Sequence, residues 1–296
     1  MSVRSPSRNQ PVEPLDCILN LSCPDKVGLV KTVSDWLYAE NGNIIDSDQF
    51  GDPNSETFFM RVHFSLREEA TTVARLRSSF AVVAEEHQMS WQLWPADEKP
   101  KVLIMVSRMD HCLVDLLYRT RIGELPVEIS LIASNHRDAY PLAAAQDIDF
   151  LHLPVTPETK VEQESRLVDE IRSRNINLVV LARYMQVLTG EFCAHMPGQI
   201  INIHHSFLPS FKGAKPYHQA FDRGVKLIGA TAHYVTEHLD EGPIIEQAVE
   251  RVDHRMTTKQ LSAVGRDVER IVLARAVRYH AERRVLINGQ RTVVFQ

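Results

Sequence analysis

The sequence predicts an α/β protein with two units, a small ferredoxin-like βαββαβ unit and a larger Rossmann-like unit with a mostly parallel sheet. Two observations support this fold class. From residue 101 onward, short apolar runs alternate with amphipathic stretches, which is the pattern of buried parallel strands connected by helices. Residues 15–95 instead order their strand and helix signals as a split β-α-β motif. The polar stretch 96–100 ends in proline and is the predicted linker.

The small unit follows residues 1–14, a polar and proline-containing stretch that we expect to be a flexible tail. Its first helix should open at residues 24–26, with Asp25 as the N-cap, and stop at the turn 41–43. The predicted elements are a strand (15–22), this helix, two strands around a turn (43–50 and 57–66), a helix over about 73–83 and a last strand (89–94).

The larger unit, residues 101–296, should place its functional residues beyond the carboxyl ends of its parallel strands, where such sheets bind ligands. The irregular stretch 207–216, with two prolines and a glycine, is predicted to be a loop. The expected strands are 101–107, 127–134, 150–155, 176–182, 199–204 and 229–236, the expected helices are 113–117, 161–174 and 257–284, and a hairpin closes the chain over 286–294.

Composition limits the class of function. The chain has 296 residues and a formal net charge of -5, which argues against a nucleic-acid-binding or anionic-membrane surface. No apolar run approaches the ~18 residues of a membrane span. The four cysteines form neither a C-x-x-C pair nor a zinc pattern, so we expect a cytoplasmic protein without disulfides and without a bound metal.

Residues 202–243 hold the candidate active site. Asn202 and His204 are two positions apart on a predicted strand and should share a face, with His205 directed away from them. Asp240 lies in a turn after the next strand and can face this pair across the end of the sheet. An Asn amide and an imidazolium can donate hydrogen bonds to an oxyanion, and a His beside a carboxylate can transfer protons. The three suit chemistry at an acyl carbon, although each alone is also an ordinary turn or core residue.

The motif N-x-H-x-S-x-L-P, followed about thirty residues later by L-D-x-G-P-I-I, resembles the signature of the folate-dependent formyltransferase family. The resemblance implies that Asn202, His204 and Asp240 are the catalytic triad and that a 10-formyl folate is the donor, with no prosthetic group. It also implies a folate-binding stretch, in which Gln186 stands where relatives often have Arg. The implied folate contacts are Tyr184, Met185, Gln186, Val187 and Leu188, with Lys215 beside the site loop and His111 and His233 as further candidates for the pocket lining.

Residues 107–113 bear on the acceptor of the formyl group. Amine-transferring members of the family carry a glycine-rich loop here that holds a phosphate, whereas this chain has no glycine at that place and Asp110 would repel a phosphate. We therefore expect hydrolysis by water to tetrahydrofolate and formate, which balances the one-carbon pool and supplies formate for purine synthesis. Asp240 would deprotonate the water, directly or through His204, while Asn202 and His204 stabilise the oxyanion. Formyl transfer to phosphoribosylglycinamide is the alternative, and a regulatory protein with an inactive site is a second.

The segments P-D-K-V-G-L-V and E-N-G-N-I-I-D, near the start of the small unit, resemble the ACT domain, a regulatory module that often binds amino acids between paired copies. The resemblance implies an amino-acid effector near residues 25–29 of one copy, which include Asp25 and Gly28, and the turn 41–45 of a neighbouring copy, which includes Asn43. It also implies an even-numbered homo-oligomer, a dimer or a tetramer. A module that only oligomerises, and binds no ligand, fits the same residues.

Overall fold

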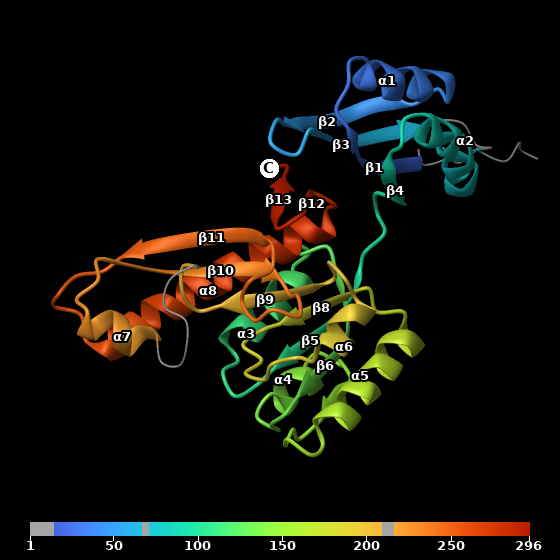
Figure 1. Cartoon of the computed structure of the whole chain (residues 1–296). Helices are drawn as coiled ribbons and strands as arrows, with labels where there is room; N and C mark the ends of the chain where they lie inside the picture. The colour runs from blue at the N-terminus through green and yellow to red at the C-terminus, as the bar shows by residue number, and fades with distance from the viewer. Residues whose placement is uncertain (1–14, 67–70, 209–215) are drawn as a thin grey trace, which may run out of the picture. The chain divides into compact units, whose positions relative to one another are not determined.

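The computed structural model describes residues 15–66, 71–208 and 216–296. Figure 1 shows the elements of the chain, which divides between Glu98 and Lys99 into two compact units. This division falls inside the stretch 96–100 that the sequence suggests as a linker. Among the described residues, none of the helices combines the length and the apolarity needed to cross a membrane.

The small unit is an antiparallel sheet of strand order β2-β3-β1-β4 with two helices packed on one face. Alternation along β1 turns Cys17, Leu19 and Leu21 toward the helices, where Trp36 and Phe80 contact each other edge to face. The predicted ferredoxin-like order is confirmed. Its elements are β1 Leu15–Pro24, α1 Leu29–Ala39, β2 Asn43–Asp52, β3 Thr57–Leu66, α2 Val73–Glu86 and β4 Ser90–Pro95.

The first helix begins later than predicted, and Asp25 is not its N-cap. Strand β1 continues to Pro24, and the amide of Asp25 donates to the Glu56 carbonyl at 2.8 Å, so the chain is still paired with the β2–β3 hairpin at this point. The helix starts at Leu29 after Gly28, whose φ of 98° belongs to the left-handed region that glycine adopts readily. The signal in the sequence was the glycine, three residues after the aspartate.

The larger unit has a seven-stranded sheet of order β11-β10-β9-β8-β5-β6-β7, parallel from β9 to β7 and antiparallel at β10 and β11. The predicted Rossmann-like, mostly parallel architecture is confirmed. Its strands are β5 Lys101–Val106, β6 Glu128–Ser134, β7 Phe150–His152, β8 Leu178–Leu181, β9 Ile200–His204, β10 Leu227–Tyr234 and β11 Ile244–Arg251, and a separate hairpin pairs β12 Val285–Asn288 with β13 Arg291–Val294. Its helices are α3 His111–Arg121, α4 Tyr140–Ala144, α5 Lys160–Arg174, α6 Gly190–His195, α7 Pro216–Asp222 and α8 Thr258–Ala281.

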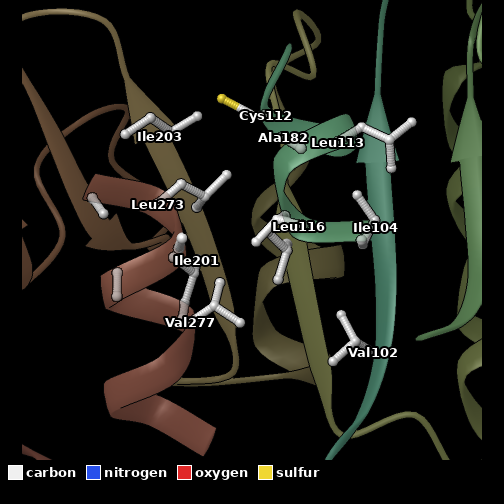
Figure 2. Close-up of a cluster of buried hydrophobic side chains, with 14 of the residues drawn as sticks. Val102, Ile104, Cys112, Leu113, Leu116, Ala182, Ile201, Ile203, Leu273 and Val277 are labelled. Atoms are coloured by element: carbon white, nitrogen blue, oxygen red, sulfur yellow. The ribbon is translucent and has the colours of Figure 1, made fainter. Parts of the chain in front are cut away.

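Helices cover both faces of this sheet. Val102 and Ile104 of β5 pack on the side of α3 and α8, as Figure 2 shows, whereas Leu103 and Met105 pack on the side of α5 and α6. Such strands are apolar along their whole length, which is why periodicity predicted them well. Helix α8 begins with a capping box between Thr257 and Gln260 and lies against β9, β10 and β11 (Figure 1).

Four elements have no counterpart in the prediction: α4, α6, α7 and β11. The three helices have 5, 6 and 7 residues, too few to show a helical period. Strand β11 is an edge strand whose residues are mostly exposed or half-buried, so its charged residues hide the strand pattern. Most of the predicted loop 207–216 lies outside the described residues.

Candidate active site

Two candidate residues project from the carboxyl end of β9. Ile201 and Ile203 point into the core beside α8, as Figure 2 shows. Alternation therefore turns Asn202 and His204 to the opposite face of the sheet, as predicted. His204 is the last residue of the strand and is only 5% exposed.

The turn after β10 brings Asp240 to the same place. A β-carbon on Gly242 would come 1.8 Å from the carbonyl oxygen of Tyr234, so only glycine fits there, and the Tyr234 amide donates to the Pro243 carbonyl at 2.9 Å. Asp240 has a φ of 57°, a conformation that Asp and Asn tolerate better than most residues. The breaker-rich sequence thus closes a tight turn that presents the carboxylate.

The structure brings the three candidate residues together. Nδ1 of His204 lies 3.2 Å from Oδ1 of Asp240, and the carboxylate is mostly buried. Burial raises the pKa of Asp240, but its interactions with the His204 and His233 rings lower it more, so the net pKa lies below its ordinary value. Nε2 of His204 is buried without a hydrogen-bond partner in the described part of the chain. It is therefore available to a bound substrate.

His233 is a fourth member of this group. Its Nδ1 lies 2.8 Å from the Tyr234 carbonyl, and because a carbonyl only accepts, this nitrogen carries the proton. In the neutral ring Nε2 then accepts from Nδ2 of Asn202 at 3.3 Å, and it lies 3.7 Å from Oδ1 of Asp240. His233 thus sets the orientation of the Asn202 amide. The sequence named it only as a candidate for the lining, because the pairing of His233 with Asn202 across β9 and β10 depends on the strand register.

His205 does not point away from His204, contrary to the prediction. Strand β9 ends at His204, so the alternation of sides stops there, and the two ring centroids lie 5.2 Å apart. Both rings line the same cavity. Burial and the positive charges of Arg183 and His204 lower the pKa of His205 to about 4, so this ring is neutral at physiological pH.

The site opens into a cavity of about 560 Å³ beside the strand ends. The segment that follows β8 forms one wall, and Met185 and Val187 are more than half exposed on it. Lys215 lies outside the described residues. All five folate candidates line the cavity: Tyr184, Met185, Gln186, Val187 and Leu188.

Both ends of this wall segment are fixed by hydrogen bonds. The Ser107 hydroxyl accepts from the Met185 amide at 3.0 Å and donates to Oδ1 of Asn135 at 2.7 Å. At the other end the Glu164 carboxylate, which is 9% exposed, accepts from the amide and the hydroxyl of Thr189, the N-cap of α6. An apolar wall held at two points suits a flat aromatic ligand.

A buried polar cluster forms another part of the cavity wall. Glu269 of α8, 1% exposed, accepts a hydrogen bond from the Tyr217 hydroxyl, and its Oε2 lies 2.7 Å from Nε2 of His111. Nε of Arg183 lies 3.5 Å from the same oxygen. Burial raises the pKa of Glu269, but the bonds from His111 and Tyr217 and the Arg183 charge lower it below its ordinary value. The carboxylate is therefore ionised.

This cluster also contains a group of possible metal donors. Ligand atoms of His111, Cys112 and Glu269 lie within 4.8 Å of one another. However, Glu269 is already bonded to His111 and Tyr217, and the Arg183 guanidinium beside it opposes a second cation. Burial also raises the pKa of the Cys112 thiol, which keeps it protonated. The donors favour a hydrogen-bonded cluster, and the absence of a metal stays a prediction.

One chain does not bring the three effector candidates of the small unit together. Oδ2 of Asp25 would lie 2.8 Å from a β-carbon on Gly51, near one end of β2, whereas Asn43 begins the same strand. Gly51 is eight positions after Asn43 along the strand, a length of roughly 27 Å. Gly28 precedes α1 on the exposed surface. An effector that contacts both Asp25 and Asn43 would need a second copy.

Comparisons with known proteins agree with this geometry. Residues 100–277 match the family model described as "Formyl transferase". A formyltetrahydrofolate deformylase of Synechocystis is 49% identical over 95% of this chain and 99% of the relative, and one of Bacillus subtilis is 45% identical over 94% and 93%. The crystal structure of the deformylase from Burkholderia mallei superposes with a TM-score of 0.91 at 52% identity, covering 96% of this chain and all of that one.

The amine-transferring enzymes resemble only part of the chain. A glycinamide ribonucleotide transformylase of Symbiobacterium toebii superposes with a TM-score of 0.63 at 32% identity and covers 67% of this chain. The similarity to deformylases extends over both units, whereas this one leaves about a third of the chain unmatched. By the extent of the match and by its identity, the chain belongs to the formyltetrahydrofolate deformylase family.

Proposed function

We propose that this chain hydrolyses 10-formyltetrahydrofolate to tetrahydrofolate and formate with Asn202, His204 and Asp240 as its catalytic residues. The observation that carries this proposal is the 3.2 Å contact of His204 Nδ1 with Asp240, which leaves the buried Nε2 of His204 free beside Asn202. An imidazolium held by a carboxylate and an amide donor together provide an oxyanion site. The pterin ring lies against the wall of residues 184–188.

The reaction proceeds in two steps at the formyl carbon. Both imidazoles contact Oδ1 of Asp240, which leaves Oδ2 to take a proton from the attacking water. The water oxygen bonds to the formyl carbon, and Asn202 and protonated His204 stabilise the resulting oxyanion. The C–N10 bond then breaks, N10 takes a proton from the site, and formate leaves ionised with the net release of one proton. These side chains fill every role, so we propose that no prosthetic group is needed.

The wall at residues 107–113 favours water as the acceptor. The Ser107 hydroxyl is already hydrogen-bonded to Asn135 and to the Met185 amide. Met109 lines the cavity at the place where the transferases hold a phosphate. The ionised Glu269 also lines the cavity, and its charge repels an anionic acceptor. No glycine-rich turn is present in this stretch.

Formate release by the purified chain tests the proposal. We expect formate from 10-formyltetrahydrofolate without any amine, and at least ~1,000-fold less from Asp240→Asn at equal protein concentration. Turnover that requires phosphoribosylglycinamide would show that the chain is a transferase. Equal rates for wild type and Asp240→Asn would exclude the catalytic role of Asp240.

We propose further that the small unit is a regulatory ACT domain that pairs with a second copy along β2. This strand is an edge of its sheet and exposes Ile44, Ile45 and Phe50. Antiparallel pairing of two β2 strands would cover them and place Asn43 of one copy near Asp25 of the other, where an amino acid could bind.

The oligomeric state tests this arrangement. We expect wild type to be a dimer or a larger even-numbered oligomer by light scattering, and Ile44→Glu to dissociate it. Val82→Glu, which changes an exposed apolar residue on α2, is the matched control. Amino acids that raise the unfolding temperature of wild type but not of Ile44→Glu would identify the effector, and the absence of any would leave oligomerisation as the role of the unit. We propose a cytoplasmic location, which the four free and buried cysteines support.

A further inference from the structure

Arg183 is a buried cation that protein groups satisfy only in part. Its side chain is 8% exposed and lines the cavity of the active site. Its Nε has no hydrogen-bond partner among the described residues, although Oε2 of Glu269 lies 3.5 Å away, and its Nη2 reaches only the thioether sulfur of Met109 at 3.7 Å. Because buried charged donors are nearly always hydrogen-bonded, this guanidinium is arranged for a partner that enters the cavity.

The backbone at Arg183 supports a functional origin for this arrangement. Its φ is 64°, in the left-handed region that disfavours most side chains and that glycine adopts freely. The conformation is fixed on both sides, because the Ser107 amide donates to the Arg183 carbonyl at 3.3 Å and the Ala182 amide to the Met105 carbonyl at 2.8 Å. An arginine at a place that suits glycine is retained against local strain, and such strain is typical of functional sites.

The guanidinium lines the same cavity as the carboxylate of the catalytic pair. Glu269 holds it, and Tyr217 joins Glu269 to the ring of His205 at a centroid distance of 6.3 Å. The ring of His205 lies 5.2 Å from that of His204. His205, which is neutral, therefore lies near two charged pairs, His204 with Asp240 and Arg183 with Glu269.

We propose that Arg183 binds the carboxylate formed at the reacting carbon, that is, the formate product and the oxygen that water contributes to it. The proposal deepens the hydrolytic function proposed above and rests on it. Attack by an amine would give a neutral amide with one oxygen, whereas attack by water gives an anion with two. Asn202 and His204 bind the formyl oxygen, and Arg183 binds the second oxygen as its charge develops. A cation at this place therefore favours hydrolysis over transfer.

Inhibition by formate tests the assignment. We expect formate to inhibit wild type, and Arg183→Gln to raise the formate Ki about 10- to 100-fold, the loss typical of a charge-assisted hydrogen bond. The KM for 10-formyltetrahydrofolate should change less than about threefold. A merely structural defect would raise KM and the formate Ki together, so a rise in Ki alone is specific to formate binding. Arg183→Lys should recover part of the affinity for formate. Arg183→Gly removes the same group at a φ that glycine prefers, and it replaces the Gln variant if that one does not fold.

Two controls separate the possible failures. Arg270→Gln changes an arginine of α8 that pairs with Asp267 at the surface and should leave the formate Ki unchanged. The glutamate of the folate is another carboxylate that Arg183 could bind, so the KM of the Arg183 variants is compared between substrates with and without this glutamate. If KM rises only for the substrate with the glutamate, and the formate Ki is unchanged, Arg183 binds the folate tail and the proposal is wrong. A formate Ki that is the same for Arg183→Gln and wild type, measured with either substrate, would also overturn the proposal. No formate from wild type would instead refute the hydrolytic function itself.

Discussion

Asp240→Asn removes the charge of the carboxylate while keeping its shape and its backbone. Asp240 has a φ of 57°, and Asn is one of the few other residues that adopt the left-handed region easily. Alanine would add backbone strain to the loss of charge, which makes it a poorer choice. Gly242 closes the turn independently of the side chain at 240. The variant should therefore fold and report on the charge alone.

The distance in the structure gives the size of the expected effect. At the 3.2 Å between His204 Nδ1 and Asp240 Oδ1, and with an effective dielectric constant of about 20, the attraction between an imidazolium and the carboxylate is about 5 kcal/mol. The two side chains are 6% and 14% exposed, so solvent screens this attraction little. Each ~1.4 kcal/mol of lost transition-state stabilisation lowers the rate tenfold. Since Asn retains a hydrogen bond to the ring, we expect kcat to fall about 1,000- to 10,000-fold.

The assay is formate release at saturating 10-formyltetrahydrofolate. Asp267→Asn makes the same chemical change at an exposed carboxylate of α8 and should leave kcat unaltered. Retention by Asp240→Asn of more than about a tenth of the wild-type kcat, in a folded protein, would refute the assigned role. The KM should change little, because the charge acts on the transition state.

Stability against pH gives an independent check on the same carboxylate. A carboxylate whose pKa is lower in the folded state than in the unfolded chain stabilises the protein above the unfolded pKa, about 3.9 for Asp. This contribution is lost as the pH falls through the lower, folded pKa of Asp240. We expect wild type to exceed Asp240→Asn in free energy of unfolding at pH 7, and the difference to shrink below pH ~4. A constant difference would show that the pKa of Asp240 is not lowered.

Three further changes test the supports of the site. His233→Gln should lower kcat about 10- to 100-fold with a similar KM, because the Asn202 side-chain amide loses the ring that orients it. An unchanged kcat would show that His233 has no role in the mechanism. Ser107→Ala leaves the Met185 amide unpaired, so KM should rise several-fold and the free energy of unfolding fall by about 1 kcal/mol, measured by kinetics and urea unfolding. Gly265→Ala would place a β-carbon 2.2 Å from the Tyr217 ring, and thermal unfolding should show a loss of about 1–3 kcal/mol; full stability would mean that the ring moves freely.

The positions of the candidate triad were accessible from the sequence because each follows from a local rule, whereas their catalytic role was inferred from the resemblance to the formyltransferase family. Strand alternation placed Asn202 and His204 on one face, and the density of turn-forming residues placed Asp240 at a reversal of the chain. The buried strands of the parallel sheet were equally clear, since they are apolar throughout. The N-cap of α1 was not, because continued pairing of β1 outweighed the preference of Asp25 for a cap.

The rest of the site depends on contacts between distant parts of the chain. His233 meets Asn202 only through the register of an antiparallel pair that periodicity does not define. Glu269 is 158 positions from His111 and lies in a helix whose pattern indicated packing against the sheet and no more. A charged residue on the buried face of that helix was the signal that could have drawn attention to it, since an unpaired carboxylate is costly there.

The adjacent histidines of the motif are chemically different because of the charges around them. His204 has the Asp240 carboxylate at 3.2 Å from its Nδ1. His205 lies between His204 and Arg183, and burial and these two positive charges lower its pKa to about 4. In the proposed mechanism, a proton taken from water near neutral pH therefore stays with the Asp240–His204 pair, because His205 is a weak base. Because His205 is neutral, the positive charge that lines the cavity beside it comes from Arg183, the group proposed to bind the second oxygen of formate.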